Sequence, residues 1–383
     1  LLDGQASIPR LVDKAIADGM PGIAITDHGN MFGVKEFFNY VKKKNSARKD
    51  KIKTLQALIE RLENGTASEA EMGEDASAAL AKARVELDAQ PKADFKGIIG
   101  CEVYVAQRRL HNKEGKGDQS GYHLILLAKN IKGYKNLIKI VSKAYTEGFY
   151  MRPRTDRVEI EKYHEGIICC SACIGGEVPR HIRADKFEEA IMWHKNLFGD
   201  DYYLELQLHK ATVEHANHEA YPEQLKVNKY LMEYANKYDI KLVCTNDVHF
   251  VDEEHAEAHD RLICLGTGKD LDDPKRMLYS KQEWMKTTAE MNALFEDVPE
   301  ALDNTVEICN KVETYSIDHA PIMPTFAIPE EFGTEEGYRS KYTEEDLFNE
   351  FTRDENGNVV MSEDEAKKKI EKLGGYDKLY RIK

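Results

Sequence analysis

The chain lacks the features that would place it in a membrane or on a nucleic-acid backbone. No stretch approaches the roughly 20 consecutive apolar residues that a membrane-spanning helix needs, and no secretory leader is visible. Positive charge is not in excess either, because the formal net charge is −14. A protein that holds DNA through its phosphates needs a basic surface. We therefore expect no membrane association, and we do not expect this chain to be a main DNA-binding surface.

A disulfide framework is also missing. The seven cysteines are an odd number and follow no regular spacing, which favours free, mostly buried thiols and a reducing cytoplasm as the compartment. One of them remains available as a metal ligand. The cysteines are Cys101, Cys169, Cys170, Cys173, Cys244, Cys264 and Cys309.

The 383 residues, of which 42 % are hydrophobic and 32 % charged, are enough for a sizeable core and suggest two domains, or one large domain with an appendage. The sequence begins at Leu1 rather than Met and ends within a helix-like pattern at Lys383. We expect it to be a fragment of a longer protein.

Short apolar patterns typical of strands alternate with longer helical patterns. The strand patterns are 22–27, 97–105, 122–128, 166–171, 202–209 and 240–247. The helical patterns between and after them include 131–147, 179–198, 219–238 and 253–265. Because strands that alternate with helices are typical of βαβ units, the pattern predicts a parallel sheet.

Residues 1–4 resemble the turn that leaves a seventh strand, and seven βα units favour a closed or nearly closed barrel. An open, doubly wound sheet is the alternative. No glycine-rich phosphate loop follows the strand at 22–27, which counts against a nucleotide-binding fold.

Two regions depart from this alternation. Residues 45–95 are rich in Lys, Glu and Ala and carry apolar residues at helical spacing, so we predict an inserted helical hairpin, with a disordered charged loop as the alternative. After residue 270 the pattern becomes helical or irregular. We therefore predict one domain over 1–270, with its insertion at 45–95, and a second, mostly helical region over 271–383.

Metal-competent side chains recur at the ends of separate strands. In a parallel barrel the strand ends and the loops after them share one face, where active sites form. Side chains from five strand patterns are therefore expected to converge, and the candidates are His28, Glu102, His123, Cys173, Asp247 and His249. Asp27 and His209 are candidates for positions beside the site.

Taken singly, each of these residues has an ordinary explanation. Asp27 and Asp247 could cap the helices that follow them, as residues at βα junctions often do. Glu102 could face water within its strand, and Cys173 could fill space in the core. The hypothesis of a site depends on the shared strand-end placement. A set of imidazole, carboxylate and thiolate ligands suits Zn²⁺, Mn²⁺ or Fe²⁺, and two or three such ions can activate water and hold the oxygens of a phosphate ester.

Six segments, taken in order, resemble the start of the bacterial DNA polymerase III alpha subunits, the replicative C-family DNA polymerases. The similarity runs from Leu1 to about residue 330 and leaves 45–95 unmatched. The segments are 1–4, 22–29, 100–102, 123–128, 245–249 and 272–276.

In that family the N-terminal region is similar to other PHP phosphoesterases, which have a distorted seven-stranded barrel and a site for up to three metal ions. Carried over residue by residue, the resemblance implies a cluster of Zn²⁺ or of Mn²⁺ and Fe²⁺ held by Asp3, His28, Glu102, His123, Cys173, Asp247 and His249. The family also has a His-x-His pair just before the Leu-Leu-Asp-Gly turn, and the present sequence begins after it.

The resemblance further implies a parent protein that synthesises DNA and binds DNA, the proofreading exonuclease subunit and other replicase subunits. The paired aspartates that would hold Mg²⁺ for polymerisation are not found by Lys383, so residues 271–383 would lead into the polymerase core. Three functions remain open for the barrel: a metal-dependent phosphoesterase or 3′–5′ exonuclease, a metal-stabilised scaffold that docks the proofreading subunit, and a stand-alone phosphatase similar to histidinol phosphatase.

Overall fold

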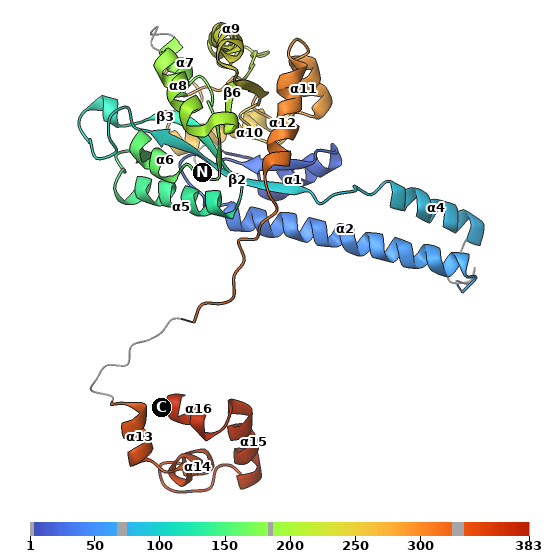
Figure 1. Ribbon diagram of the computed structural model, residues 1–383, viewed down its shortest axis with the longest axis vertical. Helices are drawn as coiled ribbons and strands as arrows, with labels where there is room; N and C mark the ends of the chain where they lie inside the picture. Colours follow the sequence, from blue (N-terminus) through green and yellow to red (C-terminus); the bar gives the residue numbers. More distant parts are fainter. Residues whose placement is uncertain (1–3, 67–74, 183–186, 324–332, 383) are drawn as a thin grey trace. The chain divides into compact units, whose positions relative to one another are not determined.

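One curled, seven-stranded sheet forms the centre of the first part of the chain (Figure 1). The computed structural model describes residues 4–66, 75–182, 187–323 and 333–382, and contacts divide the chain into two compact units, Leu1–Ile317 and Asp318–Lys383. The strands are β1 (Gly22–Ile25), β2 (Lys96–Val105), β3 (Tyr122–Ala128), β4 (Arg154–Thr155), β5 (Ile167–Cys170), β6 (Tyr202–Leu206) and β7 (Lys241–Cys244).

Helices connect and cover these strands, so the first unit is a mixed α/β structure. Its sheet is curled into a half-barrel, which is consistent with the PHP-type barrel expected from the sequence. They are α1 (Ile8–Ala17), α2 (Val34–Glu63), α4 (Ala76–Asp88), α5 (Ile131–Thr146), α6 (Arg157–Tyr163), α7 (Glu177–Ile182), α8 (Phe187–Phe198), α9 (Ala220–Tyr238), α10 (Ala256–Thr267), α11 (Thr288–Leu294) and α12 (Pro299–Lys311). Short 3₁₀ turns are η1 (Lys116–Asp118), η2 (Gly199–Asp201) and η3 (Glu253–His255). No described helix combines the length and the apolar character that crossing a lipid bilayer requires.

The strand order is β1-β2-β3-β5-β6-β7, and β4 pairs with β2 away from this path. The prediction of a wholly parallel sheet is wrong at β3, which runs antiparallel to both β2 and β5. The physical reason lies in the connection after β2, where the chain forms a loop with one 3₁₀ turn and no crossover helix. Without a crossover helix the chain returns alongside β2 in the antiparallel direction.

The seventh strand of this sheet, β4, was not predicted from the sequence. It is a two-residue strand that lies parallel to the end of β2, with Val105 paired to Thr155. The predicted strand before residues 1–4 stays a prediction. The predicted turn at residues 1–4 falls almost entirely on residues outside the described part of the chain.

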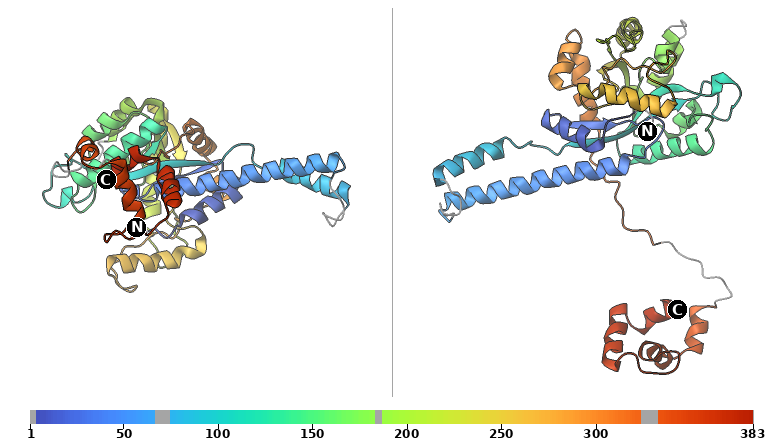
Figure 2. Two further views of the ribbon diagram at one scale, coloured as in Figure 1. Left: turned by 90° about the horizontal axis from the view of Figure 1, so that it is seen from below. Right: turned by 180° about the vertical axis from the view of Figure 1, so that it is seen from behind.

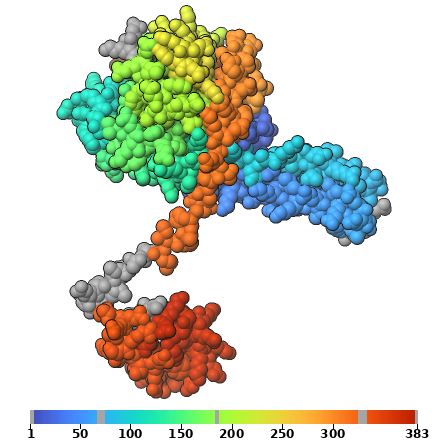
Figure 3. Space-filling view, viewed as in Figure 1, coloured from blue at the N-terminus to red at the C-terminus, as the bar shows by residue number. Residues whose placement is uncertain are grey.

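The insertion is a helical hairpin, as its apolar spacing predicts. Helices α2 and α4 lie side by side and extend beyond the sheet (Figures 1, 2 and 3). Leu55 and Leu62 of α2 and Ala79 and Ala83 of α4 are buried. The first arm begins earlier than residue 45, because α2 is one continuous helix from Val34. Its first turns pack against α1 and β1.

Contacts extend the first unit past the end of the barrel pattern, to Ile317. Helix α12 lies on the sheet, where Ile308 and Cys309 are buried against Ile98 and Val243. The side-chain amide of Asn304 donates to the Leu242 carbonyl of β7 at 2.8 Å. The assignment of residues 271–383 to the lead-in of a polymerase stays a prediction.

The second unit is a small helical body. It comprises α13 (Glu335–Lys341), α14 (Glu344–Thr352), α15 (Glu363–Leu373) and α16 (Tyr376–Ile382). Its core contains Leu347, Ile370, Leu379 and Tyr380. This agrees with the mostly helical C-terminal region expected from the sequence.

Candidate metal centre

His28 and Glu102 are held together by the backbone where the chain leaves β1. The Glu102 amide donates to the Asp27 carbonyl at 3.1 Å, and the Gly29 amide donates to the Glu102 carbonyl at 2.7 Å. These two bonds align His28 with Glu102, and the imidazole Nδ1 lies 2.8 Å from the carboxylate Oε1. Gly29 is required here, because its φ is +64° and an added Cβ would lie 2.9 Å from atoms of both Tyr104 and Pro153.

His123 reaches the same carboxylate because β3 is antiparallel. It is the second residue of β3 and lies opposite Tyr104, near the end of β2, so the start of β3 and the end of β2 share one edge of the sheet. Its Nδ1 is 2.9 Å from Glu102 Oε1. One carboxylate oxygen therefore faces two imidazoles.

Glu102 is buried, with 3 % of its surface exposed. Burial by itself raises the pKa of this carboxyl, but hydrogen bonds from His123 and His28 outweigh it and hold the pKa well below the usual range. The side chain is consequently ionised, and it presents a negative charge at a site lined by nitrogen donors.

Cys173 joins the cluster from the loop after β5. Its Sγ is 3.4 Å from His123 Nδ1 and accepts a hydrogen bond from the Gly175 amide at 3.4 Å. The His123 amide donates to the Gly175 carbonyl at 3.1 Å, which ties this loop to the start of β3. Burial, with the nearby carboxylates of Asp247 and Glu102, raises the pKa of the Cys173 thiol.

His249 completes a line of three imidazoles. Its Nε2 is 3.2 Å from His28 Nε2, and its Nδ1 is 2.7 Å from the Asp247 carbonyl oxygen. Asp247 has φ of +45°, a conformation that is uncommon for a residue with a side chain and that concentrates at functional sites. The nearest Asp247 carboxylate oxygen is 4.0 Å from His249 Nδ1.

The N-terminal segment is hydrogen-bonded to the loop after β7. The amides of Gln5 and Ala6 donate to the His249 carbonyl at 2.7 Å and 3.0 Å. Asp3, which the family resemblance adds to the ligand set, lies outside the described residues.

The two candidates for positions beside the site lie in other networks. Burial raises the pKa of Asp27, while the Gly33 amide, among other groups, lowers it. Gly33, and not Asp27, is the N-cap of α2, so the capping role considered for Asp27 is not observed. His209 is buried, 3.2 Å from the Asn246 carbonyl and 3.1 Å from the Gln224 amide nitrogen, and burial lowers its pKa.

Two site residues were not identified from the sequence. The Tyr279 hydroxyl is 3.2 Å from His249 Nε2. Glu205 of β6 is buried, and the Gln207 amide and the Thr245 hydroxyl donate to its Oε1. A signal for Glu205 was present, because Glu205, Gln207 and His209 alternate with apolar residues and so occupy one face of a strand. Tyr279 lies in an irregular segment after α10 that carries no such pattern.

The donor set fits a metal cluster. Among the described residues it offers imidazole nitrogens, a thiol and an ionised buried carboxylate, which are ligands for Zn²⁺, Mn²⁺ or Fe²⁺. Buried oxygens without a hydrogen-bond partner in the described part of the chain include Oε2 of Glu205 and Oδ1 of Asn246. A second group at the surface, Asp252, Glu254 and His255, has donor atoms within 4.8 Å of one another, but Asp252 and His255 already form the capping box of η3.

The buried Glu205 predicts a pH-dependent stability. Burial, aided by the charges of Asp247 and Glu102, raises the pKa of this carboxyl from 4.5 to about 7. Between these values the folded state holds a proton that the unfolded state has lost, so stability decreases as pH rises from about 4.5 to 7. Glu205→Gln should therefore stabilise the metal-free chain at pH 8 by up to roughly 3 kcal/mol more than at pH 5. Urea unfolding in chelator at both pH values measures this, and an equal effect at both would contradict it.

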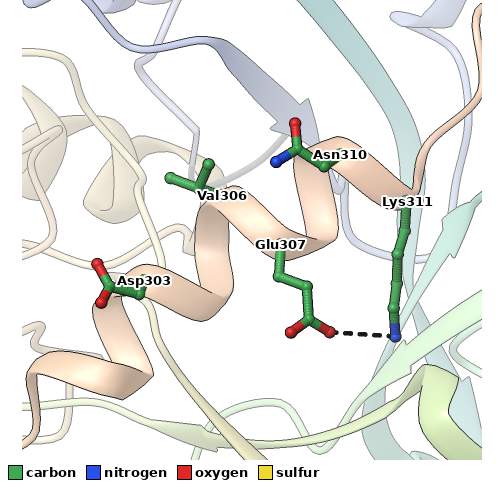
Figure 4. A pocket seen from close by; sticks show the side chains of 5 residues that line it. All are labelled: Asp303, Val306, Glu307, Asn310 and Lys311. Atoms are coloured by element: carbon green, nitrogen blue, oxygen red, sulfur yellow. Dashed lines mark ion pairs between the residues drawn. The ribbon is translucent and has the colours of Figure 1, made fainter.

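A shallow pocket elsewhere on the first unit has different chemistry. It lies on α12 and is lined by Asp303, Val306, Glu307, Asn310 and Lys311 (Figure 4). Lys241 and Lys311 pair with Glu307, which also accepts from the Tyr203 hydroxyl, and these contacts hold its pKa low despite its burial. Glu307 and Lys311 of this pocket therefore already take part in contacts that hold α12 to the sheet.

The fold and the cluster together define a class: α/β barrels that carry a set of metal-type donors at the ends of their strands. The family model of the PHP domain matches residues 1–209, and the chain belongs to this family, whose members are in general metal-binding.

Relatives show a second similarity, which covers nearly the whole chain. The chain is 39 % identical over 354 residues to DNA polymerase III subunit alpha of Borreliella burgdorferi. The alignment covers 91 % of the chain and 26 % of the relative. The same subunit of Thermus aquaticus is 35 % identical, and the alignment covers 86 % of the chain and 23 % of the relative. That of Treponema pallidum is 34 % identical, and the alignment covers 88 % of the chain and 24 % of the relative. The chain thus spans about a quarter of the length of these relatives.

Proposed function

We propose that this chain carries a metal-dependent phosphoesterase site and forms part of a DNA polymerase III alpha subunit. The observation that supports the site most directly is the position of the buried Glu102 carboxylate, one oxygen of which lies 2.8 Å from His28 and 2.9 Å from His123. A buried carboxylate with two imidazoles around one of its oxygens is suited to a cation.

The residues that would hold the ions are His28, Glu102, His123, Cys173, Asp247 and His249, with Asp3 from the family resemblance. Bound Zn²⁺, Mn²⁺ or Fe²⁺, up to three ions, would supply Lewis acidity and an activated water for attack on a phosphate ester. Glu102 would neutralise the positive charge of the cluster. The Tyr279 hydroxyl, beside His249, would donate to a phosphate oxygen, and the burial of Glu102 would keep bulk water from this ligand.

On this proposal the substrate of the site is the phosphodiester at a DNA 3′ end, and the reaction is 3′–5′ hydrolysis. The whole protein would be a DNA-directed DNA polymerase that works in the cytoplasm on DNA, with the proofreading exonuclease subunit and other replicase subunits as partners. Its polymerisation step would use Mg²⁺ at residues outside this sequence. A stand-alone phosphatase is less well supported, since the relatives are polymerase subunits. A scaffold without catalysis is the alternative that the next experiment separates from the enzyme.

Metal restoration tests the proposal. The chain is stripped with chelator, supplied with Zn²⁺, Mn²⁺ or Mg²⁺, and assayed on bis(p-nitrophenyl) phosphate and on a 5′-labelled oligonucleotide. We expect hydrolysis with Zn²⁺ or Mn²⁺ that increases as pH rises through about 7, where water on a Zn²⁺-type site ionises. His255→Ala, at the surface group, should leave it unchanged. A chain that takes up metal and hydrolyses neither substrate would exclude the phosphoesterase and favour the scaffold.

A further inference from the structure

Three aromatic rings are exposed in a row, and Phe32, at one end of it, follows the candidate ligand His28 in the same loop. Phe32, Tyr145 and Phe149 expose 70 %, 38 % and 49 % of their surface. The ring centroids of Phe32 and Tyr145 are 6.1 Å apart, and those of Tyr145 and Phe149 are 6.3 Å apart. We call these three residues the aromatic cluster. Contiguous exposed apolar groups of this kind mark binding surfaces more often than single exposed side chains do.

The position of Phe32 is fixed relative to the metal centre. It follows His28 in the loop between β1 and α2, and the buried Asn30 braces this loop. The Asn30 side chain donates to the His28 carbonyl at 3.1 Å and accepts from the Phe32 amide at 3.0 Å. These bonds link the backbone at Phe32 to the backbone at His28.

A second path connects the centre to the same segment. The Tyr104 ring meets the His123 ring edge-on, with centroids 5.3 Å apart, and the exposed Arg152 donates to the Tyr104 hydroxyl at 3.4 Å. Arg152 follows Phe149 closely in the chain, and Met151 between them is 69 % exposed. A guanidinium thus contacts a ring that packs on His123, and it lies three residues along the chain from Phe149.

The helix that carries Tyr145 is basic. Helix α5 contains four lysines and no acidic residue, although the chain as a whole has a net charge of −14. Lys132 and Lys143 pair with glutamates. Among the described residues, Lys135 and Lys139 have no carboxylate within 4.0 Å, and both are exposed. At 1.5 Å per residue, Lys135 lies about 15 Å along the helix from Tyr145.

From this arrangement we propose that the aromatic cluster and the exposed face of α5 bind a single-stranded nucleic acid whose end enters the metal centre. Surfaces for single strands combine aromatic rings, on which bases stack, with basic groups that follow the backbone. The inference rests on the proposed phosphoesterase function and adds the residues that hold the strand. A protein partner is less favoured, because lysine is depleted from the core of protein interfaces.

Binding and small-substrate hydrolysis are measured separately to test this. The probe is a fluorescein-labelled dT12, followed by anisotropy in chelator at low salt. Phe32→Leu combined with Phe149→Ala should weaken binding about tenfold or more, because each stacked base contributes strongly. Lys135→Gln with Lys139→Gln should weaken binding and reduce its salt dependence. Lys226→Gln with Lys229→Gln, two exposed lysines of α9, is the matched control and should bind as the unaltered chain does.

Hydrolysis of bis(p-nitrophenyl) phosphate, which is too small to need the cluster, should be equal in all these variants. The proposal is overturned if the unaltered chain does not bind dT12, if the aromatic variant binds it equally well, or if the substitutions change only self-association in sedimentation. If the unaltered chain does not hydrolyse bis(p-nitrophenyl) phosphate but the variants change dT12 binding as expected, the result would count against the phosphoesterase function alone.

Discussion

Glu102→Gln is expected to lower the affinity of the chain for Zn²⁺ by about 100-fold or more. Loss of groups that merely orient a metal ligand costs 10- to 100-fold, and Glu102 is placed to be a ligand itself. The substitution keeps the shape of the side chain but removes the charge that lies 2.8 Å from His28 and 2.9 Å from His123. Folding should survive, because the amide oxygen still accepts from one imidazole and burying a neutral group costs less than burying a charge.

Competition against a chromophoric chelator measures the affinity, and thermal unfolding in chelator reports on the fold. Glu114→Gln is the matched control, since the Glu114 side chain is 81 % exposed. It should bind Zn²⁺ as the unaltered chain does. Equal Zn²⁺ affinity in the Glu102 variant and the control would mean that Glu102 is not at a metal site.

The largest effect on stability is expected at Arg154. This side chain is 0 % exposed and donates to the carbonyls of Gly148, Leu110 and Asn112, at 3.1, 3.0 and 3.0 Å. Arg154→Met keeps an unbranched apolar stem but removes the guanidinium, which leaves three loop carbonyls without this donor, at about 1–3 kcal/mol each before relaxation. Because burial of the guanidinium itself is costly and is relieved, we expect a net loss of roughly 3–5 kcal/mol in the free energy of unfolding.

Urea unfolding followed by circular dichroism measures this loss. Arg261→Met, at an exposed position of α10, is the control and should change the free energy of unfolding by less than about 0.5 kcal/mol. A loss below about 1 kcal/mol at Arg154 would show that the loop carbonyls find water or other donors without it.

Local patterns in the sequence were enough to identify most elements of the fold. The six strand patterns correspond to β1, β2, β3, β5, β6 and β7, because short apolar runs bounded by polar residues are the signature of buried strands. The helical spacing of Leu55 and Leu62 likewise predicted one arm of the hairpin. The direction of β3 could not be predicted in the same way, since it depends on a loop connection rather than on the strand's own residues.

The convergence of His28, Glu102, His123 and His249 was predicted in part for the right reason. His28 and Asp247 follow the ends of parallel strands, as the barrel argument requires. His123 reaches Glu102 for a different reason, because it begins an antiparallel strand. Tyr279 depends on the path of the segment after α10, which apolar periodicity does not encode. The assignment of these residues as metal ligands stays a prediction.

The most direct test of a metal centre at Glu102 is the position of the ion. Crystals grown with Zn²⁺ or Mn²⁺ and measured across the absorption edge of the metal give an anomalous map. We predict a peak about 2 Å from Glu102 Oε1 and from an imidazole nitrogen of His28 or His123, as in other sites of this ligand type. A fully occupied ion at Asp252, Glu254 and His255, with no peak at Glu102, would contradict the account.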